Sequence, residues 1–146
     1  MEPRNGLRRA TTVLGLLLAA VGIGVQAAAF VVEGRVYVRD GDTIVVDGTP
    51  VRLQALHAPE LNETGGREAR AFVQGLVADR DVRCELTGET TYDRQVGRCY
   101  VDGQDVAALL VRAGLGRACP RFGPFYVHLE DQRHRTMPLP GYCRPR

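Results

Sequence analysis

Several features are scarce in this sequence of 146 residues, and each scarcity excludes a class of protein. Net charge is low, because 19 arginines, with no lysine at all, face 17 acidic residues and leave only +2. That excess is too small for binding of phosphate through bulk charge, so any anion site must be local. Only one uncharged stretch, residues 10–32, could cross a bilayer, which excludes a transporter with many helical spans.

The length and composition predict one folded domain. A second hydrophobic core would need roughly 100 further residues. With 45% hydrophobic and 25% charged residues, the composition is that of an ordinary globular protein, and disorder of the whole chain is excluded.

The uncharged stretch follows a short arginine-containing segment and has the layout of an export signal. Its Leu-rich run over residues 13–25 is followed by three alanines at 27–29, which is typical of a secretory signal peptide. The alternative is an uncleaved membrane anchor, since a run of this length can span a hydrocarbon core of roughly 30 Å. Residues 1–29 are therefore assigned to a signal or anchor. A cleaved signal predicts a periplasmic or secreted domain, and an anchor predicts one held outside the membrane.

Export would place the cysteines in an oxidising compartment. All four lie beyond the signal, at Cys84, Cys99, Cys119 and Cys143, and an even number in an oxidising compartment predicts two disulfides. Three pairings are possible. We favour Cys84–Cys99, which joins two strand-like runs, and Cys119–Cys143, which would tie the tail back. A zinc site is disfavoured because the sequence has no Cys-x-x-Cys pair.

The hydrophobic pattern predicts a β-rich α+β fold. Strands are expected at 31–38, 43–46, 49–56, 82–86 and 95–101, and helices at 67–78, 105–113 and, as a short one, near 126–134. Five strands with a helix between the third and fourth predict a five-stranded Greek-key barrel of the OB type with two or three helices. This domain is expected over residues 30–135, followed by a proline-rich, disulfide-tied tail over 136–146.

Four short segments carry side chains suited to phosphate chemistry: 40–43, Arg52, 57–60 and 92–94. Two aspartates on the tight turn offer oxygen ligands to a hard cation. Two arginines from different strands could bind one phosphate bidentately. With a carboxylate placed to act on water, Glu60, such a pocket would suit phosphodiester hydrolysis, whose barrier is largely electrostatic.

In order and spacing, these segments resemble the staphylococcal nuclease (thermonuclease-like) family over about residues 32–129. The resemblance rests on Asp40-Gly41-Asp42-Thr43, Val51-Arg52-Leu53, Ala58-Pro59-Glu60, and Val101-Asp102-Gly103 followed by Leu110-Val111-Arg112-Ala113-Gly114-Leu115. It implies a calcium-dependent nuclease that acts on DNA and RNA in an OB-fold barrel by attack of water on phosphorus.

The resemblance also implies roles for single residues. Asp42 matches a metal carboxylate, Arg52 the first phosphate-binding arginine, and Glu60 the proposed general base or water-orienting group. The second arginine of the family usually stands in a Tyr-Gly-Arg motif. Here Arg94, in Tyr-Asp-Arg, and Arg98, in Val-Gly-Arg, are both candidates, and the register favours Arg94.

One position departs from the family pattern, because His57 stands where a second metal carboxylate is usual. Neutral imidazole is a poor ligand for calcium and suits zinc, nickel or iron better. We therefore expect a divalent cation, calcium by resemblance, with a transition metal as the alternative and Asp40 as a compensating ligand. A simply hydrogen-bonded His57 is the ordinary alternative. A decayed metal site would leave a non-catalytic OB-fold module that binds nucleic acid or serves interactions.

The tail offers candidate contacts to nucleic acid. Arg121, Phe122 and Tyr126 lie where family members place aromatic residues beside the nucleotide, and an aromatic ring next to arginine suits base stacking. Packing of the tail on the barrel is the alternative. The sequence thus predicts an exported, metal-dependent nuclease, a monomer without a stable protein partner. It would cleave unstructured DNA or RNA with little sequence preference.

Overall fold

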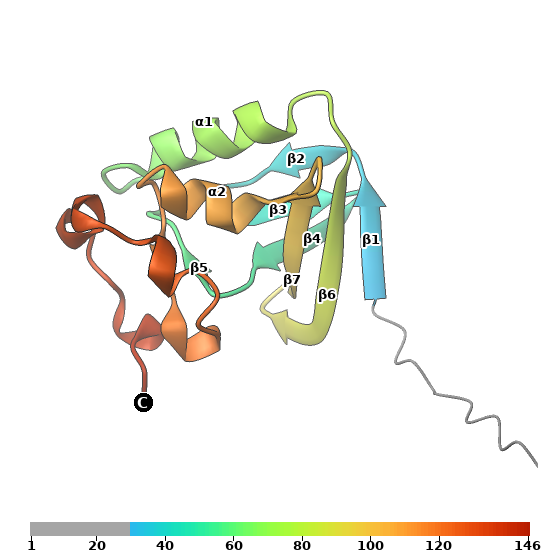
Figure 1. Ribbon diagram of the computed structural model, residues 1–146. Helices are drawn as coiled ribbons and strands as arrows, with labels where there is room; N and C mark the ends of the chain where they lie inside the picture. Colours follow the sequence, from blue (N-terminus) through green and yellow to red (C-terminus); the bar gives the residue numbers. More distant parts are fainter. Residues whose placement is uncertain (1–29) are drawn as a thin grey trace, which may run out of the picture.

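The computed structural model of the protein describes residues 30–146 (Figure 1). The expected signal or anchor segment, residues 1–29, lies outside the described residues. Within the part of the chain that the structure describes, no helix is both long and apolar enough to cross a membrane. This part is rich in strands, with two α-helices and a C-terminal series of short 3-10 turns.

Most strands belong to one sheet, whose order is β1-β6-β7-β4-β3-β2, with β8 paired to β7. Its ladders are antiparallel except for the parallel pair of β4 and β7. A separate two-stranded ladder joins β5 to β9. The bounds are β1 Phe30–Gly34, β2 Val36–Val38, β3 Thr43–Val46, β4 Thr49–Leu53, β5 Leu56–His57, β6 Val82–Thr91, β7 Arg94–Val101, β8 Gln104–Asp105 and β9 Arg117–Ala118.

The closed five-stranded barrel expected from the sequence is not formed by the described residues. The strand expected over 31–38 breaks at Gly34, whose φ is 151°, so β1 pairs with β6 while β2 pairs with β3. The strand expected over 49–56 breaks at Ala55, whose φ is 55°, and β5 leaves the sheet to pair with β9. The strand path is therefore open, with β1 and β2 at its two ends.

The turns and helices that start and stop this architecture follow local chemistry. Asp47 and Gly48 both have positive φ, 45° and 79°, which is the backbone of a two-residue hairpin turn between β3 and β4. Helix α2 (Val106–Arg112) begins at Asp105, as predicted, and the Asp105 carboxylate accepts the backbone N–H of Ala108 at 3.1 Å. The N-cap thus supplies an acceptor for one of the free N–H groups of the first turn.

Helix α1 (Gly66–Val77) also agrees with the prediction and covers one face of the sheet (Figure 1). Its inner side carries buried residues that recur at the helical period, as expected from the sequence. These are Ala69, Val73 and Val77, which join the core of Ile44, Val46, Val51, Leu53, Val82, Val101 and Leu110.

The prediction of a third helix near 126–134 is wrong, because the segment does not form one continuous helix. Two separate 3-10 turns, η2 (Val127–Leu129) and η3 (Gln132–Thr136), occupy this segment. Asp131 lies between them in extended backbone, and its carboxylate accepts the N–H of Arg133 at 2.9 Å. This cap begins a new turn and ends the previous one, which prevents one continuous helix.

Both favoured disulfides are confirmed. Cys84 and Cys99 stand opposite each other on β6 and β7 and are joined by a disulfide. Cys119 is joined to Cys143, which ties the last turn, η4 (Gly141–Cys143), to η1 (Pro120–Phe122).

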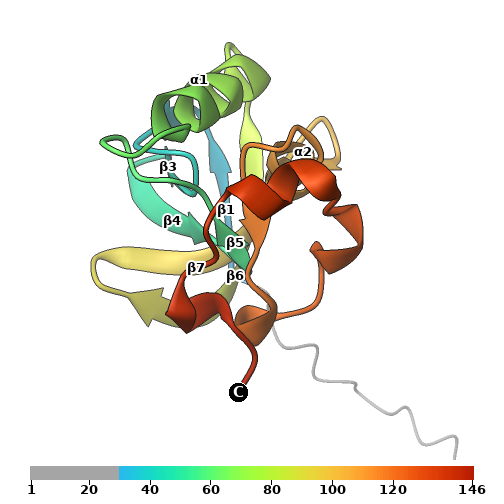
Figure 2. The ribbon, with the colours of Figure 1, turned by 90° about the vertical axis from the view of Figure 1, so that its left-hand side faces the viewer.

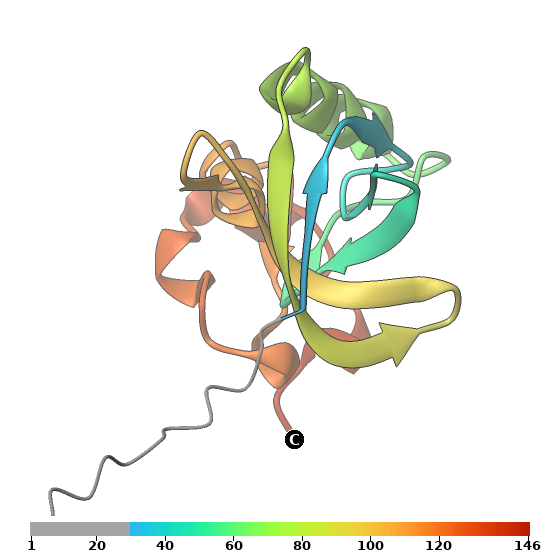
Figure 3. The same ribbon diagram turned by 90° about the vertical axis from the view of Figure 1, so that its right-hand side faces the viewer.

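The second disulfide decides where the tail runs. The C-terminal turns gather beside β5, while the hairpin of β6 and β7 projects from the sheet (Figures 2 and 3). The tail and the hairpin tip both contribute side chains to one pocket.

Candidate active site

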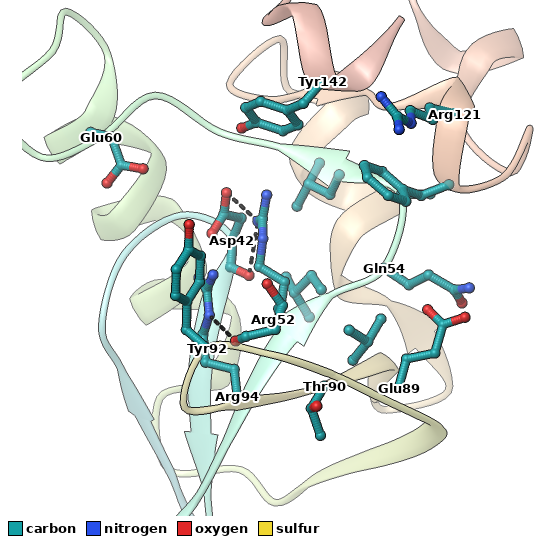
Figure 4. A pocket seen from close by; sticks show the side chains of 16 residues that line it. Asp42, Arg52, Gln54, Glu60, Glu89, Thr90, Tyr92, Arg94, Arg121 and Tyr142 are labelled. Atoms are coloured by element: carbon teal, nitrogen blue, oxygen red, sulfur yellow. Dashed lines mark hydrogen bonds and ion pairs between the residues drawn. The ribbon is translucent and has the colours of Figure 1, made fainter. Parts of the chain in front are cut away.

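A pocket of about 880 Å³ brings together side chains that are far apart in the sequence (Figure 4). Four of the residues with expected roles line it: Asp42, Arg52, Glu60 and Arg94. Asp42 lies in the turn before β3 and Arg52 lies on β4. Glu60 lies in the loop after β5, and Arg94 is the first residue of β7. Of the expected nucleic-acid contacts, Arg121 and Phe122 line the same pocket.

Asp42 occupies the centre of the pocket and is only 6% exposed. Its turn packs tightly against the core because residue 41 is glycine: a Cβ there would lie 2.6 Å from the Cβ of Ala58 and 2.9 Å from that of Ala69. The Asp42 carboxylate is ion-paired with Arg52. Burial raises the pKa of Asp42 to about 6, although the Arg52 guanidinium acts in the opposite direction.

Thr43 links this ion pair to the second arginine. Its hydroxyl donates to Oδ1 of Asp42 at 3.0 Å and accepts from Nη1 of Arg94 at 2.9 Å. Thr43 and Arg52 are cross-strand partners, and β4 lies parallel to β7, which begins at Arg94. Two guanidinium groups from neighbouring strands therefore converge on one buried threonine–aspartate pair.

Asp93, which replaces the glycine of the usual motif, contributes an unexpected contact. Its carboxylate is 2.8 Å from Nη2 of Arg39, and the hydrogen bond lowers the pKa of Asp93. The pair joins the tip of the β6–β7 hairpin to the turn that carries Asp42. Sequence reasoning missed this contact, because nothing local indicates that residues 39 and 93 meet.

Arg98, the alternative second arginine, lies outside the pocket. Its guanidinium is 3.1 Å from the Asp105 carboxylate and stacks 4.9 Å from the centroid of Phe125. Tyr126 donates its hydroxyl to the same carboxylate at 2.9 Å and is buried. The structure thus places Arg98 and Tyr126 in a packing network around the start of α2, and Tyr126 does not line the pocket.

Glu60 lies at one side of the pocket, on an exposed loop that is held against α1 (Figure 4). Its backbone N–H donates to the Glu63 carboxylate at 2.8 Å. The loop approaches the helix start so closely that a Cβ on Gly66 would lie 1.8 Å from the Glu60 carbonyl oxygen. Glycine at residue 66 is therefore what allows Glu60 to stand where it does.

His57 is buried beside the pocket and has a partner from the tail. Its Nδ1 is 3.1 Å from the hydroxyl oxygen of Tyr142, and the two rings meet edge to face. Burial, reinforced by Arg52, lowers the pKa of His57, so the imidazole is neutral at neutral pH. Tyr142 itself lines the pocket, which sequence reasoning missed; its neighbour Cys143, paired with Cys119, was the available signal.

The oxygen donors in the pocket suit a hard divalent cation that keeps much of its water. Asp42 and Glu60 line the pocket with carboxylates, and the buried Asp42 carboxylate is one that a cation would stabilise in its charged form. Asp40 lies in the same turn, where its carboxylate accepts the Asp42 N–H at 3.0 Å. Among residues 30–146, no three His, Cys, Asp or Glu side chains form a ready-made metal cluster.

The model of the staphylococcal nuclease homologue family matches residues 50–134. The chain is 38% identical over 117 residues to the succinoglycan biosynthesis protein ExoI of Rhizobium meliloti, covering 71% of this chain and 61% of that protein. It is 36% identical over 89 residues to an uncharacterized endonuclease of Escherichia coli O157:H7, covering 57% and 58%.

A third relative is an uncharacterized endonuclease of Haemophilus influenzae, 25% identical over 104 residues, which cover 68% of this chain and 58% of that protein. The chain thus spans about three fifths of the length of these curated relatives. The family match includes Arg52, Glu60 and Arg94, and it ends before Tyr142.

Replacing Gly66 with alanine should displace the Glu60 loop. The new Cβ meets backbone atoms, so we expect the free energy of unfolding to fall by about 1–3 kcal/mol. Gly75→Ala is the matched control, because Gly75 is in the same helix with open space around it. This substitution should raise the free energy of unfolding by about 0.5–1 kcal/mol. Urea denaturation of both variants makes the comparison. Equal changes in the two would show that the Gly66 contact does not restrain the loop.

Proposed function

Because the chain belongs to the staphylococcal nuclease homologue family, we propose that it is an exported, metal-dependent nuclease that hydrolyses DNA or RNA. Family membership implies an OB fold, with which the strand-rich domain agrees. The observation that carries the proposal is the pocket in which Asp42, Arg52, Glu60 and Arg94 meet.

The two arginines are proposed to bind the phosphate that is cleaved. Arg52 and Arg94 converge from neighbouring strands, and each guanidinium offers paired N–H donors of fixed geometry. As water attacks phosphorus, negative charge builds on the phosphoryl oxygens of the five-coordinate species. Donors already held in position by Asp42 and Thr43 stabilise that charge without reorganising.

Glu60 is proposed to act on the attacking water. Its carboxylate accepts a proton from the water as the new P–O bond forms, while the bond to the leaving oxygen breaks; that oxygen keeps the bonding electron pair and takes a proton from solvent water. The close contact with Gly66 restrains the backbone of Glu60 beside the pocket, which supports this role.

Asp42 is proposed to hold a divalent cation, calcium by family resemblance, with Asp40 and His57 as further candidate ligands. When bound, the cation would neutralise charge on a phosphoryl oxygen. His57 offers only nitrogen, and its Nδ1 already contacts Tyr142, so a transition metal would be bound through the other ring nitrogen.

Nucleic acid in unstructured form is the proposed substrate. Arg121 and Phe122 border the pocket, and Tyr92, at the hairpin tip, is 95% exposed. Exposed aromatic rings beside arginines bind unstacked bases with little regard to sequence. A duplex would keep its bases stacked inside and would not present them to these rings.

The disulfides support the proposal of export. Two disulfides in so short a chain are typical of the periplasm or the extracellular space, because cytosolic thiols are kept reduced. We propose that residues 1–29 direct this export as a cleaved signal or an anchor, that residues 30–135 form the nuclease domain, and that residues 136–146 are its tied tail.

A second function is favoured by two observations. His57 contacts Tyr142, and the described residues hold no cluster of three metal-binding side chains. A chain that had lost its cation would remain a non-catalytic OB-fold module that binds nucleic acid or serves interactions.

Glu60→Gln should lower the rate of cleavage of denatured DNA by about 10²–10⁴-fold, because the amide cannot accept the proton of water. Glu68→Gln is the control, since Glu68 is an exposed residue of α1 that does not line the pocket. Release of short fragments from a labelled strand measures both. Full activity of the Glu60 variant would exclude the proposed role.

Arg94→Lys should reduce cleavage by about 10²–10³-fold, because a single ammonium cannot replace paired guanidinium donors at the developing charge. Arg98→Lys should retain the activity of the wild-type chain, since Arg98 contacts Asp105 and not the pocket. Rates are compared at protein concentrations corrected for folded fraction by circular dichroism. The reverse ranking would assign the phosphate to Arg98.

His57→Asp should lower the Ca²⁺ concentration that gives half-maximal cleavage, by about tenfold, because a second carboxylate adds negative charge and oxygen ligands. His128→Asp makes the same charge change on an exposed residue outside the pocket and should leave the Ca²⁺ requirement unchanged. Calcium titrations of cleavage and of thermal unfolding test this. An unchanged titration in the His57 variant would place the cation elsewhere.

A further inference from the structure

Tyr142 reaches the pocket from the tail, beyond the segment that the family match covers. It lies in η4, and the last residue of that turn, Cys143, is fully buried and bonded to Cys119. In Figure 4 its ring lies over the part of the pocket that holds Asp42 and Arg52. The tail therefore places an aromatic ring next to the residues proposed to bind phosphate.

The Tyr142 ring is fixed at both ends and open in between. Its hydroxyl lies 3.1 Å from Nδ1 of the buried His57, and its backbone is held by the disulfide. The residue is nevertheless 48% exposed. A ring held in this way loses little conformational freedom when a flat group binds against it.

The same disulfide brings a second aromatic residue to this side of the pocket. Cys119 directly precedes η1, which carries Arg121 and Phe122, and η1 packs against η4. Phe122 is half exposed and lines the pocket together with Tyr142. An arginine and two accessible rings on one rim form the kind of surface on which nucleobases stack.

We propose that Tyr142 is a substrate-binding residue whose ring stacks on the base of a nucleotide next to the phosphate held by Arg52 and Arg94. The inference rests on the proposed function and adds a contact to it. The Cys119–Cys143 disulfide acts through Tyr142 as a positioning element. The hydroxyl is occupied by His57, so the ring face makes the contact with the base.

The test compares a short labelled oligothymidine with an abasic strand of the same length, by fluorescence anisotropy in EDTA, so that the strands stay intact. The wild-type chain should bind the base-bearing strand more tightly. Tyr142→Ala should weaken binding of that strand by about 10–100-fold and leave the abasic strand within about twofold. Tyr142→Phe keeps the ring and should stay within about threefold of wild type on both strands.

The inference is overturned if Tyr142→Ala still binds the base-bearing strand more tightly than the abasic strand by the wild-type ratio. It is also overturned if the variant loses affinity equally for both strands. A gain in affinity would show that the ring obstructs binding and would overturn it too. Absence of wild-type binding to the base-bearing strand overturns it too. Cleavage of denatured DNA by the wild-type chain with Ca²⁺ is measured in parallel. If the wild-type chain cleaves DNA but Tyr142→Ala does not change strand binding, only the stacking contact is refuted. If the wild-type chain does not cleave DNA, the proposed function is refuted.

The double variant Cys119→Ser/Cys143→Ser keeps the Tyr142 ring and releases its anchor. It should lose most of the preference for bases over abasic sugar while retaining binding of the abasic strand. An unchanged preference would overturn the positioning role assigned to the disulfide.

Discussion

The ion pair between the buried Asp42 and the part-buried Arg52 is the constraint on which the site depends. A carboxylate removed from water is costly unless charged or polar donors surround it, and removal of one partner leaves the other uncompensated. Asp42 meets this requirement through Arg52 and Thr43, and Thr43 in turn fixes Arg94. One buried acid thus aligns two guanidinium groups from separate strands toward a common opening.

The surrounding fold serves to hold that acid in place. Glycine at residue 41 lets the turn sink against Ala58 and Ala69, and glycine at residue 66 lets the Glu60 loop lie against the helix start. The salt bridge of Arg39 and Asp93 fixes the hairpin tip to the same turn. The hydrophobic core supplies the platform, while these close approaches supply the geometry.

Elements governed by local rules could be predicted from the sequence. The apolar period of α1, the Asp105 cap of α2 and the turn at Asp47 and Gly48 each depend on neighbouring residues alone. The two disulfides could be predicted from the even number of cysteines, the signal-like N-terminal pattern and the strand pattern. Barrel closure could not be predicted, because it depends on where Gly34 and Ala55 turn the chain and on which strands then pair.

The same distinction applies to the site. Asp42, Arg52, Glu60 and Arg94 could be named as a set through the resemblance to the nuclease family, and all four line one pocket. Tyr142 was not named, because the predicted Cys119–Cys143 disulfide ties the tail to the domain but does not indicate that the residue before Cys143 reaches the pocket. Tyr126 has the residue type of a nucleotide contact, but its hydroxyl is bound to Asp105 and its ring is in the core.

The most direct test of the central claim is a cleavage assay of the protein on denatured DNA with Ca²⁺, Mn²⁺, Mg²⁺ or Zn²⁺, and with EDTA. The pocket built around Asp42 predicts that the strand is shortened with at least one of these cations and stays intact in EDTA. DNA that is bound but never shortened, whichever cation is present, would contradict a hydrolytic site and leave a nucleic-acid-binding module.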